Sequence, residues 1–295
     1  MLLHFTNLSK ISLETFSYKK TNIELYATLY RSTQKTTRAT LLYFHGGGLL
    51  YGKRTDLPEY HIDTFCDAGY SILAFDYRLA PVTKLSHIID DVKDAIIWYL
   101  NNRTDLFQSK CPYFLWGRSA GAYLCLLAPK IDLPEKPIGI LSYYGYTFAH
   151  DSWYNQPSPY YLQFPAVDAE TIASICKEGE TAEGLLDTRY SLYVYARQTG
   201  KWICMINDNS IEDFYNLYSL KKLTDFDYYP PVFLAHSFHD MDVPFAESQI
   251  LSSLLPKSHL FVASAKTHEF DKDTTSEETL SLIDESLYFM NEINS

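Results

Sequence analysis

Ser119 lies in the pentapeptide GRSAG at 117–121, between an apolar run and a helical pattern. In a G-x-S-x-G turn between a strand and a helix, small flanking residues let the serine take a strained backbone and present its hydroxyl as a nucleophile. The N-terminus of the following helix would also direct N–H groups toward negative charge that develops near Ser119. The same pattern also describes a serine that caps a core helix between packing glycines, so the pentapeptide alone does not decide.

A glycine box, HGGG at 45–48, directly follows the apolar run that begins at residue 39. Gly46, Gly47 and Gly48 carry no side chains, so their N–H groups can approach a carbonyl oxygen closely. Together with the N–H of Ala120 they would form an oxyanion hole. The alternative is a flexible turn between a strand and the next helix. Because both motifs occur in the order that an acyl hydrolase requires, we predict that Ser119 is the nucleophile of a hydrolase.

A serine nucleophile of this type needs an acid and then a base, in the order Ser, Asp or Glu, His along the chain. Asp240 follows the apolar run at 231–237, where a loop could present its carboxylate to an imidazole, and Asp242 is its nearest rival. Only His259 and His268 lie beyond Asp240. His259 begins an apolar run and would face away from the site, whereas His268 follows that run. We therefore predict Asp240 as the acid and His268 as the base.

Six apolar runs of strand length, rich in β-branched and aromatic residues, recur along the chain. Most are apolar almost throughout, which suits strands covered on both faces in a mainly parallel sheet. Residues 23–30 (IELYATLY) alternate better and predict an antiparallel edge strand. The six runs are 39–45, 71–77, 113–117, 138–144, 231–237 and 259–264.

Helical patterns occupy the intervals between these runs. The alternation of strand and helix predicts an α/β fold, a mainly parallel, doubly wound sheet within one domain over 1–295. It stops between 147 and 230, an interval rich in Tyr and Trp. A structureless loop of that length is improbable inside a domain, so we predict an inserted helical cap there. The expected helices lie at 57–69, 88–102, 119–129, 166–177, 188–198, 211–223, 245–255 and 276–293.

The composition excludes several classes of protein. The 295 residues are 46% hydrophobic and carry a net charge of −11, with 36 acidic and 25 basic side chains. No basic stretch could bind phosphates, which disfavours nucleic acid and anionic membranes as partners. Five cysteines without a C-x-x-C pair argue against a disulfide framework and a structural zinc site. With no signal peptide in the polar N-terminus, we expect a cytoplasmic protein.

Three segments together resemble the hormone-sensitive-lipase-like esterases of the α/β-hydrolase superfamily. They are the HGGG box, the G-x-S-A-G turn and the segment DYRLAP at 76–81 between them. The resemblance covers most of the chain apart from the predicted cap, and it implies a structural role for His45. It further implies these site residues: nucleophile Ser119, acid Asp240, base His268, and oxyanion donors Gly47, Gly48 and Ala120.

The chain departs from that family at two positions near the motifs. Arg118 stands where many members carry Asp, and Val82 follows the proline of DYRLAP where Glu is frequent. Arg118 could favour an anionic or polar substrate, or it could pair with a nearby carboxylate. The family usually draws much of its cap from residues before the first core strand. Since this chain has a short segment there, its cap would come mainly from 147–230.

Aromatic residues make up 16% of the chain, and several cluster in the predicted cap. Such side chains could line a pocket for a small acyl or aryl ester, or they could only pack the cap onto the sheet. The cluster consists of Trp153, Tyr154, Tyr160 and Tyr161.

The sequence as a whole predicts a serine carboxylesterase that hydrolyses small, short-chain esters through an acyl-enzyme on Ser119, without a cofactor or metal. One alternative is a serine peptidase of the prolyl-oligopeptidase type, against which the glycine box speaks. The other is a protein that binds a small molecule on the same scaffold without catalysis, against which His268 speaks. The expected partner is a small-molecule ester, and the sequence leaves open whether the chain forms a homodimer.

Overall fold

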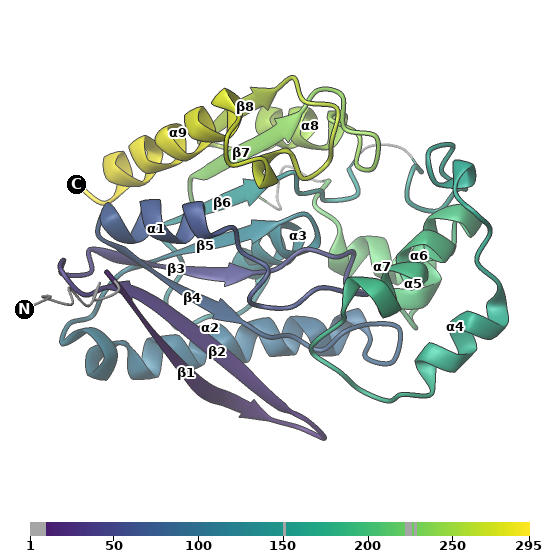
Figure 1. The fold of residues 1–295 in the computed structure, drawn as a ribbon, viewed down its shortest axis with the longest axis horizontal. Helices are drawn as coiled ribbons and strands as arrows, with labels where there is room; N and C mark the ends of the chain where they lie inside the picture. Colours follow the sequence, from purple (N-terminus) through teal and green to yellow (C-terminus); the bar gives the residue numbers. More distant parts are fainter. Residues whose placement is uncertain (1–9, 150–151, 222–225, 227–228) are drawn as a thin grey trace, which may run out of the picture.

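The computed structural model describes residues 10–149, 152–221, 226 and 229–295. Its centre is an eight-stranded sheet in the order β1-β2-β4-β3-β5-β6-β7-β8 (Figure 1). The strands are β1 (Ile11–Lys20), β2 (Glu24–Ser32), β3 (Ala39–Phe44), β4 (Tyr70–Phe75), β5 (Tyr113–Arg118), β6 (Gly139–Tyr143), β7 (Val232–Ser237) and β8 (Ser258–Ala263).

The strands β3 to β8 run parallel to one another, as the six apolar runs predicted. Every residue of β3, β4, β5, β6 and β7 is buried, because helices cover both faces of the sheet. The predicted doubly wound α/β fold is therefore confirmed.

The other end of the sheet differs from the prediction in one strand. Residues 23–30 fall in β2, which pairs antiparallel with β4 as expected, but β1 lies outside it and forms the edge. Most β1 residues are at least partly exposed, and Tyr18 is buried there, donating a hydrogen bond to the backbone oxygen of Asp76 at 2.6 Å. With so little apolar surface, β1 gave a weak strand signal in the sequence.

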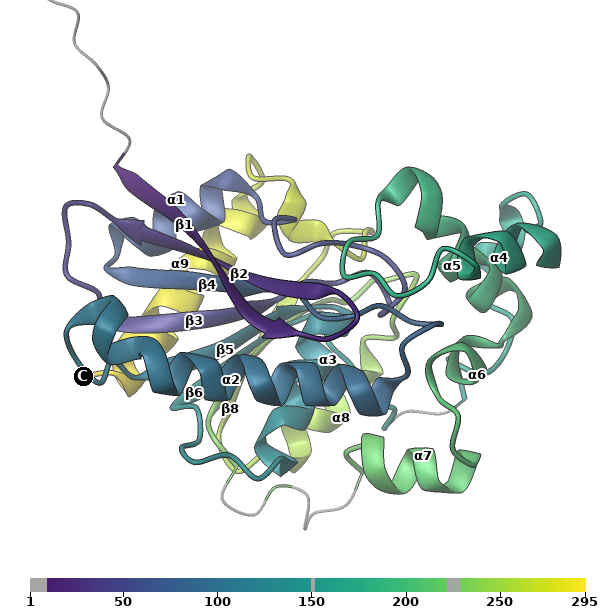
Figure 2. The same cartoon turned by 90° about the horizontal axis from the view of Figure 1, so that it is seen from below.

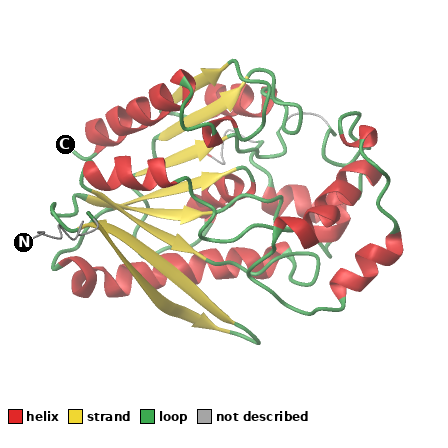
Figure 3. Ribbon diagram, in the orientation of Figure 1, coloured by secondary structure: helices red, strands yellow, loops and turns green. Residues whose placement is uncertain are grey.

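Helices form one layer on each side of the sheet (Figures 1, 2 and 3). One layer holds α1 (Glu59–Asp67) and α9 (Glu277–Ile293), whose apolar side chains join one buried cluster. The opposite layer holds α2 (Leu85–Phe107), α3 (Ala120–Leu127) and α8 (Ala246–Leu254), which join the other cluster. All five agree with predicted helices to within a few residues.

Most of the described residues between β6 and β7 lie beyond the carboxyl ends of the parallel strands, and helices joined by loops are the regular elements there (Figures 1 and 2). Its helices α4 (Ala169–Cys176), α5 (Leu186–Thr199) and α7 (Ile211–Tyr218) match three predicted patterns, although residues 222–223 of the last pattern lie outside the described residues. A short helix, α6 (Trp202–Ile206), was not predicted. We call residues 147–230 the cap segment.

None of the helices in the described ranges is long and apolar enough to cross a membrane. All five cysteines are free thiols.

The contact between α3 and β3 tests the fold directly. A Cβ atom added to Gly121 would lie 1.9 Å from the backbone oxygen of Phe44, so Gly121→Ala must separate the helix from the sheet. We expect it to lower the free energy of unfolding by about 3 kcal/mol or more, measured by urea denaturation. The control is Gly179→Ala, where the added atom meets nothing within 4 Å and we expect a loss of about 1 kcal/mol. Equal losses would contradict this packing.

Candidate active site

The predicted site residues come together at one edge of the sheet. The glycine box follows β3, Ser119 follows β5, Asp240 follows β7 and His268 follows β8. Because the carboxyl ends of parallel strands lie at the same edge, four segments far apart in sequence meet there.

The backbone at Ser119 is strained. Its φ is 51° and its ψ is −118°, in a region that residues other than glycine rarely occupy and that costs about 1–3 kcal/mol. Gly117 and Gly121 make the turn possible, since a Cβ atom on Gly117 would lie 2.2 Å from the backbone carbon of Gly121. The Ser119 side chain makes no capping hydrogen bond to α3. Ser119 stands at the N-cap position of α3, but its hydroxyl points away from the helix N–H groups.

That hydroxyl contacts His268. The distance between Ser119 Oγ and His268 Nε2 is 2.8 Å, and His268 Nδ1 lies 2.6 Å from Oδ2 of Asp240. A carboxylate can only accept, so Nδ1 carries a proton toward Asp240, and in the neutral form of the ring Nε2 can accept from the serine. The three residues thus form the hydrogen-bonded chain that a serine nucleophile, a general base and an orienting acid require.

The structure distinguishes Asp240 from its rival Asp242. The Asp240 side chain is fully buried, and its Oδ1 also accepts hydrogen bonds from the backbone N–H groups of Asp242 and Val243. His236 Nε2 lies 3.2 Å from Asp240 Oδ2. The Asp242 carboxylate instead accepts two hydrogen bonds of 3.0 Å from the Tyr193 hydroxyl of the cap segment. His259 lies away from this group and pairs with Glu285 at 2.7 Å.

The Asp240–His268 pair shifts the pKa values of both groups. Burial disfavours each charged form, but the opposite charge of the partner outweighs it. The pKa of Asp240 is held well below its usual range, and the pKa of His268 is raised from 6.5 to about 9. Asp242 and Glu269 contribute smaller negative potentials at His268.

Hydrogen bonds orient successive peptide groups of the glycine box. The Gly46 carbonyl lies 2.7 Å from His45 Nδ1, and the Gly47 carbonyl accepts from the N–H groups of Leu50 and Tyr51. In a planar trans peptide the N–H points opposite the carbonyl, so these contacts turn the N–H groups of Gly47 and Gly48 the other way. Both glycines have positive φ, 106° and 60°.

His45 supports this geometry from inside the core. It is fully buried and stacks on Tyr77 with ring centroids 4.3 Å apart, and burial lowers its pKa to about 4. The Tyr77 hydroxyl donates to the His45 carbonyl at 2.8 Å. The resemblance implied a structural role for His45, and its burial and its contacts with Tyr77 agree with that role.

Gly46 and Ala120 complete the surroundings of the serine. A Cβ atom on Gly46 would lie 3.3 Å from the Cβ of Ser119, so the glycine box borders the nucleophile directly. Ala120 is the first residue of α3, and its N–H has no acceptor within the helix. That Gly46, Gly47, Gly48 and Ala120 form an oxyanion hole stays a prediction.

Arg118 belongs to a buried polar network behind the serine. It forms an ion pair with Asp271 at 2.9 Å, donates to the Tyr144 hydroxyl at 2.6 Å and reaches the Asp56 backbone oxygen at 3.1 Å. His61 Nε2 lies 3.1 Å from the same Asp271 carboxylate. Of the two readings of Arg118, pairing with a carboxylate is confirmed. Burial opposes ionisation of Asp271, but Arg118 and His61 keep its pKa well below the usual range.

The network also reaches the base. The edge of the Tyr144 ring contacts His268, with centroids 4.7 Å apart, and the Tyr144 hydroxyl donates to Asp271 at 2.7 Å. Sequence reasoning missed Asp271 and His61, because no local motif connects them with residues so far away along the chain.

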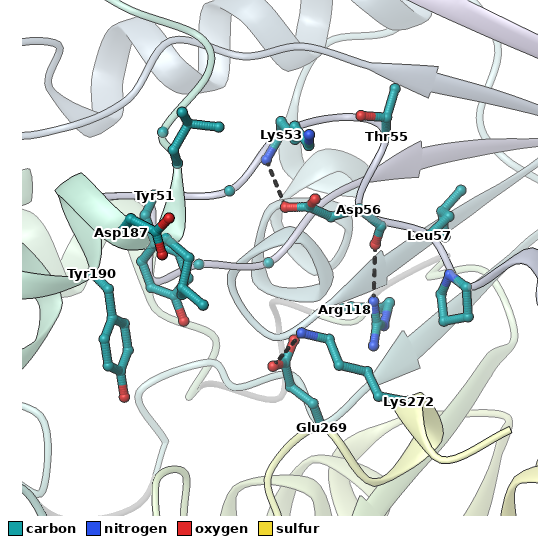
Figure 4. Close-up of a pocket in the computed structure, with 17 residues that line it drawn as sticks. Tyr51, Lys53, Thr55, Asp56, Leu57, Arg118, Asp187, Tyr190, Glu269 and Lys272 are labelled. Atoms are coloured by element: carbon teal, nitrogen blue, oxygen red, sulfur yellow. Dashed lines mark hydrogen bonds and ion pairs between the residues drawn. The ribbon is translucent and has the colours of Figure 1, made fainter.

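A cavity of about 910 Å³ adjoins this site (Figure 4). Gly46, Gly47 and Arg118 line it beside the nucleophile, and residues 184–187 with Tyr190 line it from the cap segment. Charged groups of both signs surround it, including Lys53, Asp56, Asp187, Glu269 and Lys272. Lys272 and Glu269 pair at 2.7 Å.

The aromatic side chains of this cavity are not those that the sequence singled out. Tyr51 and Tyr190 line it and contact each other edge to face, with centroids 5.3 Å apart. The expected cluster packs within the cap segment: Trp153 against Tyr154, and Tyr160 against Tyr161. None of these four side chains is among the described residues that line this cavity. Of the two roles predicted for the cluster, packing within the cap segment fits the structure better.

No group of three or more His, Cys, Asp or Glu side chains among the described residues could hold a metal ion.

Comparison with known proteins now places the chain in a family. Residues 27–134 match the BD-FAE family model. A protein of unknown function from Staphylococcus aureus subsp. aureus Mu50 is 30% identical, covers 96% of this chain and 100% of its own, and superposes with a TM-score of 0.83. An alpha/beta hydrolase superfamily protein from Enterococcus faecalis is 27% identical over 95% of this chain and 99% of its own, with a TM-score of 0.80. The chain belongs to the α/β-hydrolase superfamily. The resemblance that its motifs indicated is confirmed at that level.

Other relatives of this α/β-hydrolase match a smaller part of the chain or share less of its sequence. The non-reducing polyketide synthase ausA of Aspergillus calidoustus is 30% identical over 165 residues, which is 50% of this chain but 7% of the synthase. The chain thus spans a small part of such curated relatives. Solved esterases of about 15–17% identity share the fold, with TM-scores from 0.67 to 0.68.

The titration of His268 tests the electrostatics of this α/β-hydrolase. We expect its imidazole to titrate above 6.5, because the Asp240 carboxylate stabilises the imidazolium. Asp240→Asn removes that charge and should lower the pKa of His268, as followed by NMR of the ring protons. Asp242→Asn is the matched control and should lower it less. A His268 pKa that does not respond to Asp240→Asn would contradict the pairing.

The Arg118–Asp271 ion pair tests the network behind the serine. Arg118→Met leaves the buried carboxylate without its cation, so we expect the free energy of unfolding at neutral pH to fall by about 3–5 kcal/mol. In the control, Arg31→Met breaks a largely exposed pair with Glu14 and should cost about 1 kcal/mol or less. Urea denaturation measures both, and equal losses would show that Arg118 is not held as described.

Proposed function

We propose that this chain is a serine carboxylesterase that hydrolyses small, short-chain carboxylic esters. The observation that carries the proposal is the contact of 2.8 Å between Ser119 Oγ and His268 Nε2, at a strained turn and with Asp240 behind the imidazole. Three features favour a nucleophile over a structural serine at this position: the strained backbone of Ser119, the lack of a helix-capping bond from its side chain, and the adjacent glycine box.

The proposed reaction has two steps. His268 takes the hydroxyl proton as Ser119 attacks the ester carbonyl, and the N–H groups of Gly47, Gly48 and Ala120, near Gly46, stabilise the tetrahedral oxyanion. His268 then gives the proton to the leaving alcohol, and an acyl-enzyme remains on Ser119. Water, activated by the same imidazole, attacks the acyl group and releases the acid. Asp240 holds the imidazole in the required tautomer throughout.

The cap segment, 147–230, would close the substrate site from above the sheet edge. Its residues 184–187 and Tyr190 line the same cavity as Gly46 and Gly47, and this cavity has the volume of a small-molecule site (Figure 4). The proposed substrate enters this cavity with its carbonyl beside Gly46 and Gly47. Since the cavity walls carry Lys53, Asp56 and Asp187 beside two tyrosines, they suit a small ester with polar substituents better than a long acyl chain.

The decisive assay is release of p-nitrophenol from p-nitrophenyl acetate and butyrate, by the wild type and by Ser119→Ala. We expect turnover in the wild type that increases toward mildly alkaline pH, because His268 must lose its proton to act as a base. Ser119→Ala should lose about 10⁴-fold or more in kcat.

A peptide p-nitroanilide assayed in parallel separates an esterase from a peptidase. We expect the ester to be hydrolysed far faster than the amide. Turnover that survives Ser119→Ala would refute the nucleophile, and a wild type inert to both substrates would favour a binding protein.

A further inference from the structure

Two side chains of the cap segment contact the glycine box. The indole Nε1 of Trp202, in α6, donates a hydrogen bond to the Gly48 carbonyl at 2.9 Å, and the bond is buried. The ring of Tyr193, in α5, lies against the same glycine, since a Cβ atom on Gly48 would be 2.3 Å from Cδ2 of Tyr193. Both side chains are almost fully buried, so solvent does not compete for either contact.

With the hydrogen bond from Trp202, each of the three glycine carbonyls of the box has a partner. The first two carbonyls of the glycine box are held by its own neighbourhood: Gly46 by His45, and Gly47 by the N–H groups that follow it. The third carbonyl, that of Gly48, is held from the cap segment; it shares its peptide plane with the N–H of Leu49, so the bond from Trp202 fixes the backbone that directly follows the Gly48 donor. The end of the box nearest the cap thus depends on residues about 150 positions later in the chain for its orientation.

Tyr193 also reaches the loop of the triad acid. Its hydroxyl donates to both carboxylate oxygens of Asp242 at 3.0 Å, and the backbone N–H of Asp242 donates to Oδ1 of Asp240 at 2.8 Å. Arg197, one turn further along α5, donates to the Asp242 carbonyl at 2.9 Å. Tyr193 therefore touches the glycine box with its ring and the acid loop with its hydroxyl.

The two side chains also fix each other. The rings of Tyr193 and Trp202 meet edge to face, with centroids 5.7 Å apart and an interplanar angle of 89°. Movement of either ring would disturb the other, so the glycine box and the acid loop are connected through a single packed unit.

We propose that Tyr193 and Trp202 are positioning residues for ester hydrolysis, which hold the oxyanion donors of the glycine box in register with Asp240 and His268. The inference rests on the proposed function. It assigns to the cap segment a part in the chemical step besides covering the substrate. Since the two side chains act on donors that bind the oxyanion most strongly in the transition state, their loss should reduce kcat more than it changes KM.

Trp202→Phe tests the indole hydrogen bond with the aromatic packing kept. We expect kcat for p-nitrophenyl acetate to fall about ten- to a hundredfold, with KM within about twofold, because a small displacement of the donors is costly. The matched control is Trp153→Phe. Trp153 lies in the same aromatic group, 5.9 Å from the Trp202 ring, but its indole donates to Glu247 and not to the glycine box. The control should keep kcat within about twofold of the wild type.

Tyr193→Phe tests the hydroxyl separately, because the ring against Gly48 remains. We expect a fall in kcat with little change in KM, and a thermal midpoint close to that of Trp153→Phe would show that the variant is folded. A second readout is the rate at which a fluorophosphonate probe labels Ser119, since its phosphoryl oxygen needs the same donors. Labelling should slow in parallel with kcat for both variants.

The outcomes separate this inference from the proposed function. If the wild type neither hydrolyses the ester nor is labelled at Ser119, the proposed function fails and the inference falls with it. If the wild type does both, while Trp202→Phe and Tyr193→Phe match Trp153→Phe in kcat and labelling rate, the inference alone is overturned.

Discussion

The close approach of α3 to the end of β3 is the constraint on which the site depends. Gly121 allows the helix to meet the backbone of Phe44 and His45, and Gly117 allows the preceding strand to turn into it without a side chain in between. Ser119 is left in a conformation with φ of 51° that packing on both sides maintains. The same approach brings the helix N-terminus beside the glycine box, so the nucleophile and the proposed oxyanion donors share one structural origin.

Buried charge surrounds that turn in two matched units. Asp240 lies within hydrogen-bond distance of His268 and His236, and Asp271 contacts Arg118 and His61. Burial alone would favour the neutral acids, but in each unit the basic partners outweigh it. Tyr144 lies between the two units, with its ring against His268 and its hydroxyl on Asp271. The imidazole of His268 is thus held by the Asp240 carboxylate and by the ring of Tyr144.

Local patterns in the sequence predicted what local physics determines. The buried strands were predictable because they are apolar almost throughout. Ser119 and Asp240 could be chosen because each follows such a strand, and His268 because it follows the apolar run of β8, although only Ala263 of that strand is buried. The edge strand β1 was not predicted, because it buries little apolar surface and so gives a weak sequence pattern. The partner of Arg118 could not be predicted, since Asp271 is 153 positions away. The residues that line the cavity could not be predicted from the sequence either, because they depend on how the segment around Gly184 lies against Tyr51 and Gly52.

The central claim is that the strained turn makes Ser119 the nucleophile that carries the acyl group. It is tested most directly by mixing the protein with p-nitrophenyl acetate, quenching in acid at successive times and locating acetyl groups by mass spectrometry of the peptides. We expect one acetyl group on the Ser119 hydroxyl that accumulates during turnover and decays when the ester is exhausted. Turnover with an unmodified Ser119, or with the acetyl group on another side chain, would contradict it.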